Sequence, residues 1–299
     1  MIGSIVRELA EAELQKIGLL SNSQYLSVDS FAEINPGLSS VGTVSLTKEI
    51  SIFYKFISGD PGTRLQTEEL GLAELRKSAC LRVPRVYCRF KIPNGGEILL
   101  SEHIPTGKRD RRFEEIAGHQ LALLHQTATA ETFGWLMDNW IGATPQPNTT
   151  SHDWREFFRK NRLEFQIKRA LEVGRITPQE FSLLQNAITR MVTLLPEKCL
   201  PVLIHGDLWS GNLLTDSKGL PVFIDPACYF AHHEAEFGMT TLFGNFGDRF
   251  LHAYQEIQPL ESGWEERVRV YKLYHLLNHL NLFGRTYWNA VEEEIRRFC

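Results

Sequence analysis

Three polar residues with acid–base and metal-binding side chains lie close together in the second half of this 299-residue chain. Asp207 and Asn212 are five positions apart in the stretch His-Gly-Asp-Leu-Trp-Ser-Gly-Asn, and Asp225 follows thirteen positions later. An aspartate can accept the proton of an attacking hydroxyl group. Carboxylate and amide oxygens are also the ligands that Mg²⁺ prefers. The set predicts Asp207 as a catalytic base and Asn212 and Asp225 as magnesium ligands.

The segments around these residues predict a strand, a loop, a strand, a turn and a strand. His-Gly-Asp alone is a common turn, so the prediction rests on this whole arrangement. Its spacing resembles the catalytic loop and metal-binding aspartate of protein-kinase-like phosphotransferases. His-Gly-Asp replaces His-Arg-Asp, and Asp225 begins Asp-Pro-Ala rather than Asp-Phe-Gly, which favours a kinase of small molecules. The apolar strands are expected at 202–204, 213–214 and 222–224, with the turn at 216–219.

A lysine in an apolar strand is the candidate ligand for nucleotide phosphates. Lys55 lies in Ile-Ser-Ile-Phe-Tyr-Lys-Phe-Ile, where an unpaired buried ammonium would be costly. The alternative is an edge-strand lysine that reaches solvent. Its expected partner is Glu68, which shares the apolar face of a helix over 64–77. Glu69, one position further round, is the rival partner.

Two further segments are expected to bind the nucleotide. The loop 35–42 contains Gly37, Ser39 and Ser40, whose backbone N–H groups and hydroxyls could surround a phosphate. An ordinary hairpin is an equally good interpretation of that loop. The backbone around Glu102, His103 and Ile104, at the end of the strand 97–104, is expected to bind adenine. ATP is the expected nucleotide.

Aromatic and histidine-rich segments leave several interpretations open. Trp209 lies within the loop, where its indole would either bind a sugar ring or pack beneath the loop. His232-His233-Glu234-Ala-Glu236 contains potential zinc ligands but lacks the HExxH spacing. His275, Asn278 and His279 share a helical face, but buried polar groups usually hydrogen-bond one another. Zinc is therefore disfavoured at both segments.

The order of the predicted elements indicates an α+β, bilobal, protein-kinase-like fold. A β-rich N-terminal nucleotide-binding lobe with one key helix is expected over 1–104. A mainly α-helical lobe for catalysis and substrate binding is expected over 105–299. The helices are predicted at 2–17, 64–77, 112–126, 154–173, 177–195, 234–257 and 264–295, and the strands of the first lobe at 43–47, 50–57, 85–92 and 97–104.

The composition excludes several classes of protein. Hydrophobic residues make up 43% and charged residues 23% of the chain, as in soluble globular proteins. The net charge of −4 argues against a nucleic-acid-binding protein. The five scattered cysteines form no CxxC pair, which indicates reduced thiols. A charged N-terminal stretch and the absence of a run of ~18 apolar residues argue against secretion and membrane insertion. A cytoplasmic location is expected.

Longer motifs resemble the fructosamine kinase (ketosamine 3-kinase) family, over about residue 34 to the C-terminus. They are His205–Asn212, Asp225–Met239, Leu273–Gly284 and Pro-Gln-Pro-Asn at 145–148 with the aromatic residues that follow. The resemblance implies ATP- and Mg²⁺-dependent phosphorylation of the C3 hydroxyl of a ketosamine, which frees the amine. It implies the roles given above for Asp207, Asn212, Asp225 and Lys55. Trp209, His233 and Glu234 are then expected at the substrate.

The phosphate loop departs from the family pattern, since Pro-Gly-Leu-Ser-Ser-Val-Gly replaces the usual Gly-Gly-Cys/Ser-Ile-Asn. A kinase of another amino sugar, aminoglycoside or amino alcohol is one alternative, and a nucleotide-binding module without turnover is another. The sequence leaves open whether the ketosamine is free or protein-bound, and derived from ribose or glucose. It also leaves open whether the chain is a monomer or a homodimer.

Overall fold

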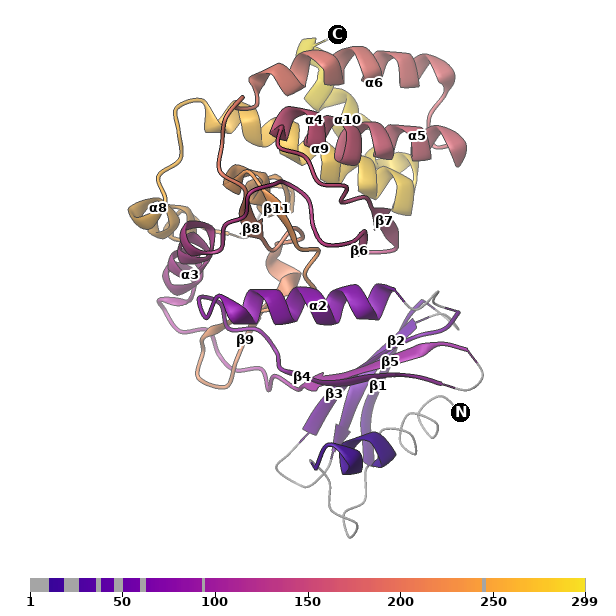
Figure 1. Ribbon diagram of the computed structural model, residues 1–299, viewed down its shortest axis with the longest axis vertical. Helices are drawn as coiled ribbons and strands as arrows, with labels where there is room; N and C mark the ends of the chain where they lie inside the picture. Colours follow the sequence, from indigo (N-terminus) through magenta and orange to yellow (C-terminus); the bar gives the residue numbers. More distant parts are fainter. Residues whose placement is uncertain are drawn as a thin grey trace. The chain divides into compact units, whose positions relative to one another are not determined.

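The computed structural model describes residues 11–18, 27–35, 39–45, 51–59, 63–92, 95–243 and 246–298 (Figure 1). The chain forms two compact units. The N-terminal unit contains Met1–Lys77, Arg82–Asp110 and Leu214–Ile224, and the C-terminal unit contains Ser78–Leu81, Arg111–Leu213 and Asp225–Cys299. The contacts therefore assign a hairpin from the second half of the chain to the N-terminal unit, whereas the predicted boundary after residue 104 placed it in the second lobe.

An antiparallel five-stranded sheet forms the body of the N-terminal unit. Its strand order is β1-β2-β3-β5-β4. One face buries an apolar cluster that includes Tyr54, Phe56 and Leu100, together with Leu14 from the helical residues 11–16. The strands are β1 Ser27–Asn35, β2 Ser39–Ser45, β3 Ser51–Ile57, β4 Val86–Lys91 and β5 Glu97–Glu102.

Helix α2, Arg64–Lys77, lies along the other face of this sheet and contacts β4 and β5 (Figure 1). Its boundaries are those predicted from the apolar spacing. Leu65 packs with Ile57 and Leu99 of the sheet. Because side chains alternate along a strand, the face of β3 that carries Ile57 also carries Lys55. The apolar pattern thus sets both the position of α2 and the direction of the lysine.

The C-terminal unit is mainly helical, as predicted. Helix α3, Phe113–Thr127, packs against α8, Asp248–Ile257. Helix α6, Pro178–Met191, begins within one residue of its predicted start, with a capping box in which Thr177 and Glu180 exchange hydrogen bonds. Helices α9, Trp264–Phe283, and α10, Trp288–Ile295, complete the group that Figure 1 shows around α6 and α5, Phe165–Glu172.

The helix predicted over 154–173 contains a π-helical turn. It consists of α4, Trp154–Phe158, the π-helix η1, Arg159–Glu164, and α5, Phe165–Glu172. The wider turn contains Arg162, whose side chain points into the interior and has no exposed surface. Such turns often accompany functional sites.

Short strand pairs carry the predicted catalytic segments. β8, Val202–Ile204, pairs with β11, Tyr229–Ala231, and β6, Asn139–Ile141, pairs with β7, Thr144–Gln146. The hairpin of β9, Leu213–Thr215, and β10, Pro221–Phe223, connects the loop after β8 to Asp225. The predicted order of strand, loop, strand, turn and strand is therefore present.

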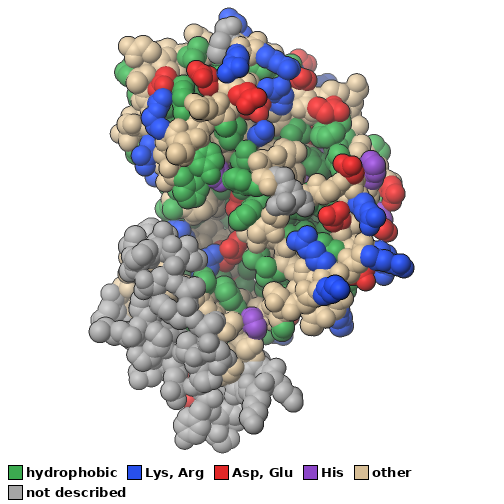
Figure 2. Space-filling model, turned by 180° about the vertical axis from the view of Figure 1, so that it is seen from behind, with side chains coloured by type: hydrophobic (Ala, Val, Ile, Leu, Met, Phe, Trp, Pro, Cys, Tyr) green, Lys and Arg blue, Asp and Glu red, His purple; other side chains and the backbone are tan. Residues whose placement is uncertain are grey.

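The described surface carries charges of both signs. On the face shown in Figure 2, lysine and arginine side chains lie among aspartate and glutamate side chains, and the drawn residues form no large basic field there. None of the helices in the described ranges is long and apolar enough to cross a membrane. Cys80, Cys88, Cys199 and Cys228 are free thiols.

Candidate active site

The loop after β8 brings two of the predicted catalytic side chains together. The Nδ2 group of Asn212 donates hydrogen bonds to the backbone oxygen of Asp207 at 2.8 Å and to its Oδ2 atom at 3.3 Å. A 3₁₀ turn at Ser210–Asn212 returns the chain, and the backbone N–H of Asn212 donates to the carbonyl of Trp209. The amide nitrogen of Asn212 is thereby held, and its Oδ1 atom is the one suited to bind a cation.

Gly206 lets this loop lie directly against the segment that follows Asp225. Its φ angle is +82°, and a Cβ atom there would lie 2.2 Å from the carbonyl oxygen of Ala227. The backbone N–H of Ala227 donates to the carbonyl of His205 at 2.9 Å. The catalytic loop and the segment that carries Asp225 are therefore joined through their backbones.

A buried glutamate holds the start of the loop. The carboxylate of Glu236 accepts hydrogen bonds from the backbone N–H groups of His205 at 2.6 Å and Gly206 at 3.0 Å. Glu236 is in η4, His233–Glu236, and its side chain is fully buried. Two N–H groups held by one charged acceptor fix the loop just before Asp207. No sequence pattern indicates this role, because the contact joins residues about thirty positions apart.

Asp225 has an uncommon backbone conformation, with a φ angle of +51°. Non-glycine residues adopt this left-handed region rarely, and aspartate tolerates it better than most residues. Such conformations persist where the surrounding structure fixes them, and they concentrate at functional sites. The conformation is consistent with a carboxylate that the fold holds in a set direction.

An aromatic pocket of about 340 Å³ adjoins Asp207 in the C-terminal unit. Ring contacts run continuously along its wall from Trp209 through Phe243 and His279 to Phe283 and Tyr287. Asp207 is the one charged group among the described lining residues. The others are Ile141, Gly142, Trp209, Met239, Phe243, Asn278, His279, Leu282, Phe283 and Tyr287.

Two lining residues answer questions that the sequence left open. Trp209 keeps 36% of its surface exposed, so its indole is part of the pocket wall and is not buried beneath the loop. His279 lines the pocket, although its pattern had suggested only internal hydrogen bonds. Its Nδ1 atom lies 2.7 Å from the carbonyl oxygen of His275, so this nitrogen carries the hydrogen. Burial lowers the pKa of His279, which leaves Nε2 as an uncharged acceptor.

The predicted lysine–glutamate pair forms in the N-terminal unit. Lys55 Nζ lies 2.7 Å from Glu68 Oε2, and the two side chains are 17% and 15% exposed. Glu69, the rival partner, binds Arg89 instead. The apolar face of the helix therefore correctly predicted which glutamate pairs with Lys55. The role of Lys55 and Glu68 toward a nucleotide stays a prediction.

The second half of the predicted phosphate loop belongs to strand β2. Ser39 and Ser40 are buried residues of β2, paired with Ile57 and Phe56 of β3, and are not loop residues. Burial then alternates through Ser40, Gly42 and Val44, and the pairing with β3 starts at Ser39, so the strand begins earlier than predicted. This burial argues against their predicted contact with phosphates. Gly37 lies outside the described residues.

The segment expected to bind adenine ends strand β5. The carboxylate of Glu102 accepts from Arg82 and from the backbone N–H of Arg85, and the backbone N–H of Glu102 donates to the Arg85 carbonyl. His103 Nδ1 lies 2.6 Å from the Ser51 hydroxyl, and Ile104 is buried. Adenine binding at these residues remains a prediction.

Comparison with known proteins gives the family. The sequence matches the fructosamine kinase family over residues 14–299. A probable ketoamine kinase of Enterococcus faecium is 43% identical over 236 residues, which cover 78% of this chain and 82% of that protein. The chain belongs to the fructosamine kinase family. Membership makes it an ATP-dependent phosphotransferase that acts on a hydroxyl group.

Other members and solved structures agree with this assignment. The chloroplastic protein-ribulosamine 3-kinase of Arabidopsis thaliana is 36% identical over 91% of this chain and 83% of its own. A candidate fructosamine-3-kinase of Haemophilus somnus has a TM-score of 0.83 at 25% identity, covering 97% of this chain and 96% of that one. The aminoglycoside phosphotransferase APH(4)-Ia shares the fold alone, with a TM-score of 0.60 at 14% identity over 98% and 96%. The predicted α+β protein-kinase-like fold is confirmed.

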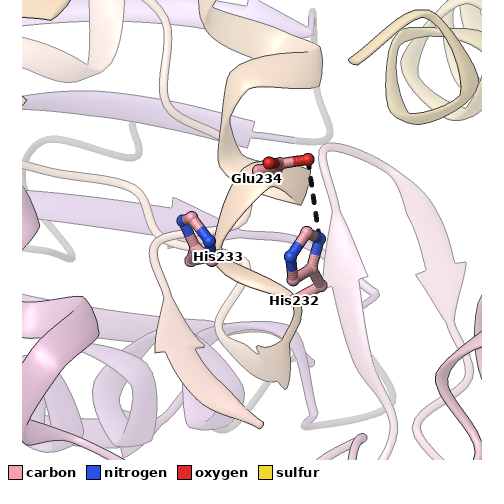
Figure 3. Close-up of side chains that lie close together, drawn as sticks. All are labelled: His232, His233 and Glu234. Atoms are coloured by element: carbon pink, nitrogen blue, oxygen red, sulfur yellow. Dashed lines mark ion pairs between the residues drawn. The ribbon is translucent and has the colours of Figure 1, made fainter. Parts of the chain in front are cut away.

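The histidine string of this fructosamine kinase is part of its interior. His232, His233 and Glu234 could place one ligand atom each within 4.8 Å of one another (Figure 3). Both oxygens of Glu234 already accept from Arg267, and each histidine Nδ1 bonds a buried tyrosine hydroxyl. Burial lowers the pKa of His233 to about 3, so the ring is neutral. These contacts support neither zinc nor the predicted substrate role of His233 and Glu234.

Proposed function

We propose that this protein is a ketosamine 3-kinase, which transfers the γ-phosphoryl group of ATP to the C3 hydroxyl of a ketosamine. The observation that carries the proposal is the position of Asp207, the predicted base, which is the charged residue among the described residues that line the aromatic pocket. Relatives named ketoamine kinase and protein-ribulosamine 3-kinase support the acceptor class and the position. Phosphorylation at C3 would destabilise the adduct and release the amine.

The lining of the pocket suits an amino sugar. At neutral pH the secondary amine of a ketosamine is an ammonium group, which aromatic faces and a carboxylate attract. Trp209 offers a flat apolar face for the sugar, and Nε2 of His279 offers an acceptor for a hydroxyl or N–H group. An aminoglycoside carries several ammonium groups, for which the described lining has only one carboxylate. The pocket therefore favours a ketosamine over a polycationic sugar.

The catalytic groups would act by positioning and charge. Asp207 would orient the acceptor hydroxyl and receive its proton at the carboxylate. Asn212 and Asp225 offer oxygen donors that fit magnesium, which supplies charge neutralisation on the phosphates when bound. The held amide nitrogen of Asn212 leaves its oxygen for this purpose. Lys55, oriented by Glu68, would bind the nucleotide phosphates.

A substrate panel tests the proposal. We expect ADP formation with ribulose-lysine and fructose-lysine in the presence of Mg²⁺, and none above background with choline or an aminoglycoside. Preference for one of the latter would move the protein to another kinase class. A rise in melting temperature with ATP, but no ADP from any acceptor, would indicate a nucleotide-binding module.

The free thiols, typical of a reducing compartment, lead us to propose a cytoplasmic location as well.

A further inference from the structure

A buried network of side-chain amides is hydrogen-bonded to the segment that follows Asp225. The β6–β7 hairpin places Asn139 directly opposite Gln146. Nε2 of Gln146 donates to Oδ1 of Asn139 at 2.8 Å, and Nδ2 of Asn148 donates to the same oxygen at 2.8 Å. All three side chains are almost fully buried. A buried polar network destabilises the fold unless all its hydrogen-bonding groups have partners, so we asked which contacts this one makes.

Two side chains of this network donate hydrogen bonds to backbone carbonyls close to Asp225. Nδ2 of Asn139 donates to the carbonyl of Cys228 at 2.8 Å, and Nε2 of Gln146 donates to the carbonyl of Ala227 at 3.2 Å. The N–H of Ala227 is held by the catalytic loop, at the carbonyl of His205. Both backbone groups of Ala227, two residues after Asp225, are therefore bonded.

The far side of the network is held by a buried cation. Arg162, in the π-helix, donates to Oδ1 of Asn148 at 2.7 Å and to the Pro147 carbonyl at 2.5 Å. Its guanidinium lies 3.9 Å from the ring centre of Tyr229, in the strand that follows Cys228. The hydroxyl of Tyr274 donates to Oε1 of Gln146 at 2.6 Å and so sets which way this amide faces.

We propose that Asn139, Gln146 and Asn148, oriented by Arg162 and Tyr274, are positioning residues for the metal-binding carboxylate of Asp225. They fix the carbonyls of Ala227 and Cys228, and this keeps Asp225 in its left-handed conformation. The inference rests on the proposed function, in which Asp225 is a magnesium ligand. It also gives a role to the Pro-Gln-Pro-Asn motif, whose side chains line no part of the pocket described above.

Gln146→Met is the direct test, because it keeps the length of the side chain and removes both donors. Loss of an outer-shell partner typically costs about 10- to 100-fold in metal affinity. We therefore expect the Mg²⁺ concentration for half-maximal ADP formation to rise by about 10-fold or more. Excess Mg²⁺ should restore most of the rate. If Gln146 served only to stabilise the fold, excess Mg²⁺ would not restore the rate of ADP formation.

Binding gives a readout that needs no turnover. We expect ADP in the presence of a chelator to raise the melting temperature of Gln146→Met as much as that of the wild type. The additional rise caused by Mg²⁺ should shrink in the variant. Glu294→Gln is the matched control, since it weakens the bonds of a buried carboxylate to Arg269 and Lys272, and none of these three residues belongs to this network. The control should be destabilised but keep its Mg²⁺ requirement within about 2-fold, far below the change expected for an outer-shell partner.

Equal Mg²⁺ requirements for Gln146→Met and Glu294→Gln would overturn the inference. If Gln146→Met does not fold, Tyr274→Phe is the second test, because it keeps the ring and removes the hydroxyl that donates to Gln146. We expect a rise of a few-fold in its Mg²⁺ requirement, at or below the lower end for an outer-shell partner, and an unchanged requirement would also overturn the inference. Failure of the proposed function is a separate result, namely a wild-type protein that makes no ADP with any ketosamine while Mg²⁺ still strengthens ADP binding.

Discussion

Replacing Glu236 by glutamine tests whether the buried carboxylate fixes the catalytic loop. Its two oxygens accept from the N–H groups of His205 and Gly206. Glutamine keeps one acceptor oxygen and turns an NH₂ group toward the other N–H. The loss of one bond to a charged group, with a buried N–H left unpaired, costs about 3 kcal/mol. Each 1.36 kcal/mol lost in the transition state slows the reaction tenfold, so we expect kcat to fall by at least about 10-fold and by up to about 100-fold, depending on how much of this loss displaces the loop in the transition state.

Glu234→Gln supplies the matched control. Glu234 is two residues away in the same short helix and is equally buried, but it bonds Arg267 rather than the catalytic loop. Breaking this buried ion pair is also destabilising, by about 3 kcal/mol or more. Steady-state ADP formation, measured well below both melting temperatures, should show a low kcat for Glu236→Gln and a near-normal kcat for Glu234→Gln. Equal kcat values in the two variants would refute the role of Glu236.

Three further predictions concern the base, the lysine and acid stability. Asp207→Asn should lower kcat by about 10²- to 10⁴-fold in the same assay, and activity within a few-fold of the wild type would remove Asp207 from the mechanism. Lys55→Met should lower kcat/KM for ATP by at least about 10-fold, or 1.4 kcal/mol, and an unchanged value would contradict a phosphate contact. Burial lowers the pKa of both His233 and His275 to about 3. Their stabilising effect is present above their ordinary pKa of 6.5 and is lost as the pH falls toward 3, by up to about 1.4 kcal/mol per pH unit for each group. Urea unfolding at pH 7, 6 and 5 should show this loss, and a flat profile would argue against neutral buried rings.

Local patterns predicted those parts of the molecule that depend on near neighbours in the sequence. The apolar spacing of α2 gave its boundaries and favoured Glu68 over Glu69 as the partner of Lys55. The capping residues gave the start of α6. The turn chemistry around 216–219 gave the hairpin that leads to Asp225. In each case the deciding residues lie within one element or in elements that follow one another along the chain.

Contacts between distant residues could not be predicted in this way. Nothing near Glu236 indicates that it binds a loop about thirty residues earlier, and nothing near Asn139 indicates that it binds Cys228, 89 residues later. The family resemblance led us to expect His233 and Glu234 at the substrate, whereas both are buried and bond Tyr254 and Arg267. Ser39 and Ser40 were expected in a loop because hydroxyl residues are common there, whereas strand pairing with β3 decides their position.

The identity of the phosphorylated hydroxyl tests the central claim most directly. The protein would be incubated with ATP, Mg²⁺ and a ribulose-lysine peptide, and the product examined by phosphorus–proton correlation NMR. We predict a phosphate coupled to the proton on C3, followed by release of the free lysine amine, and neither signal with Asp207→Asn. Phosphate on another hydroxyl group, or ATP binding without transfer to any ketosamine, would contradict the account.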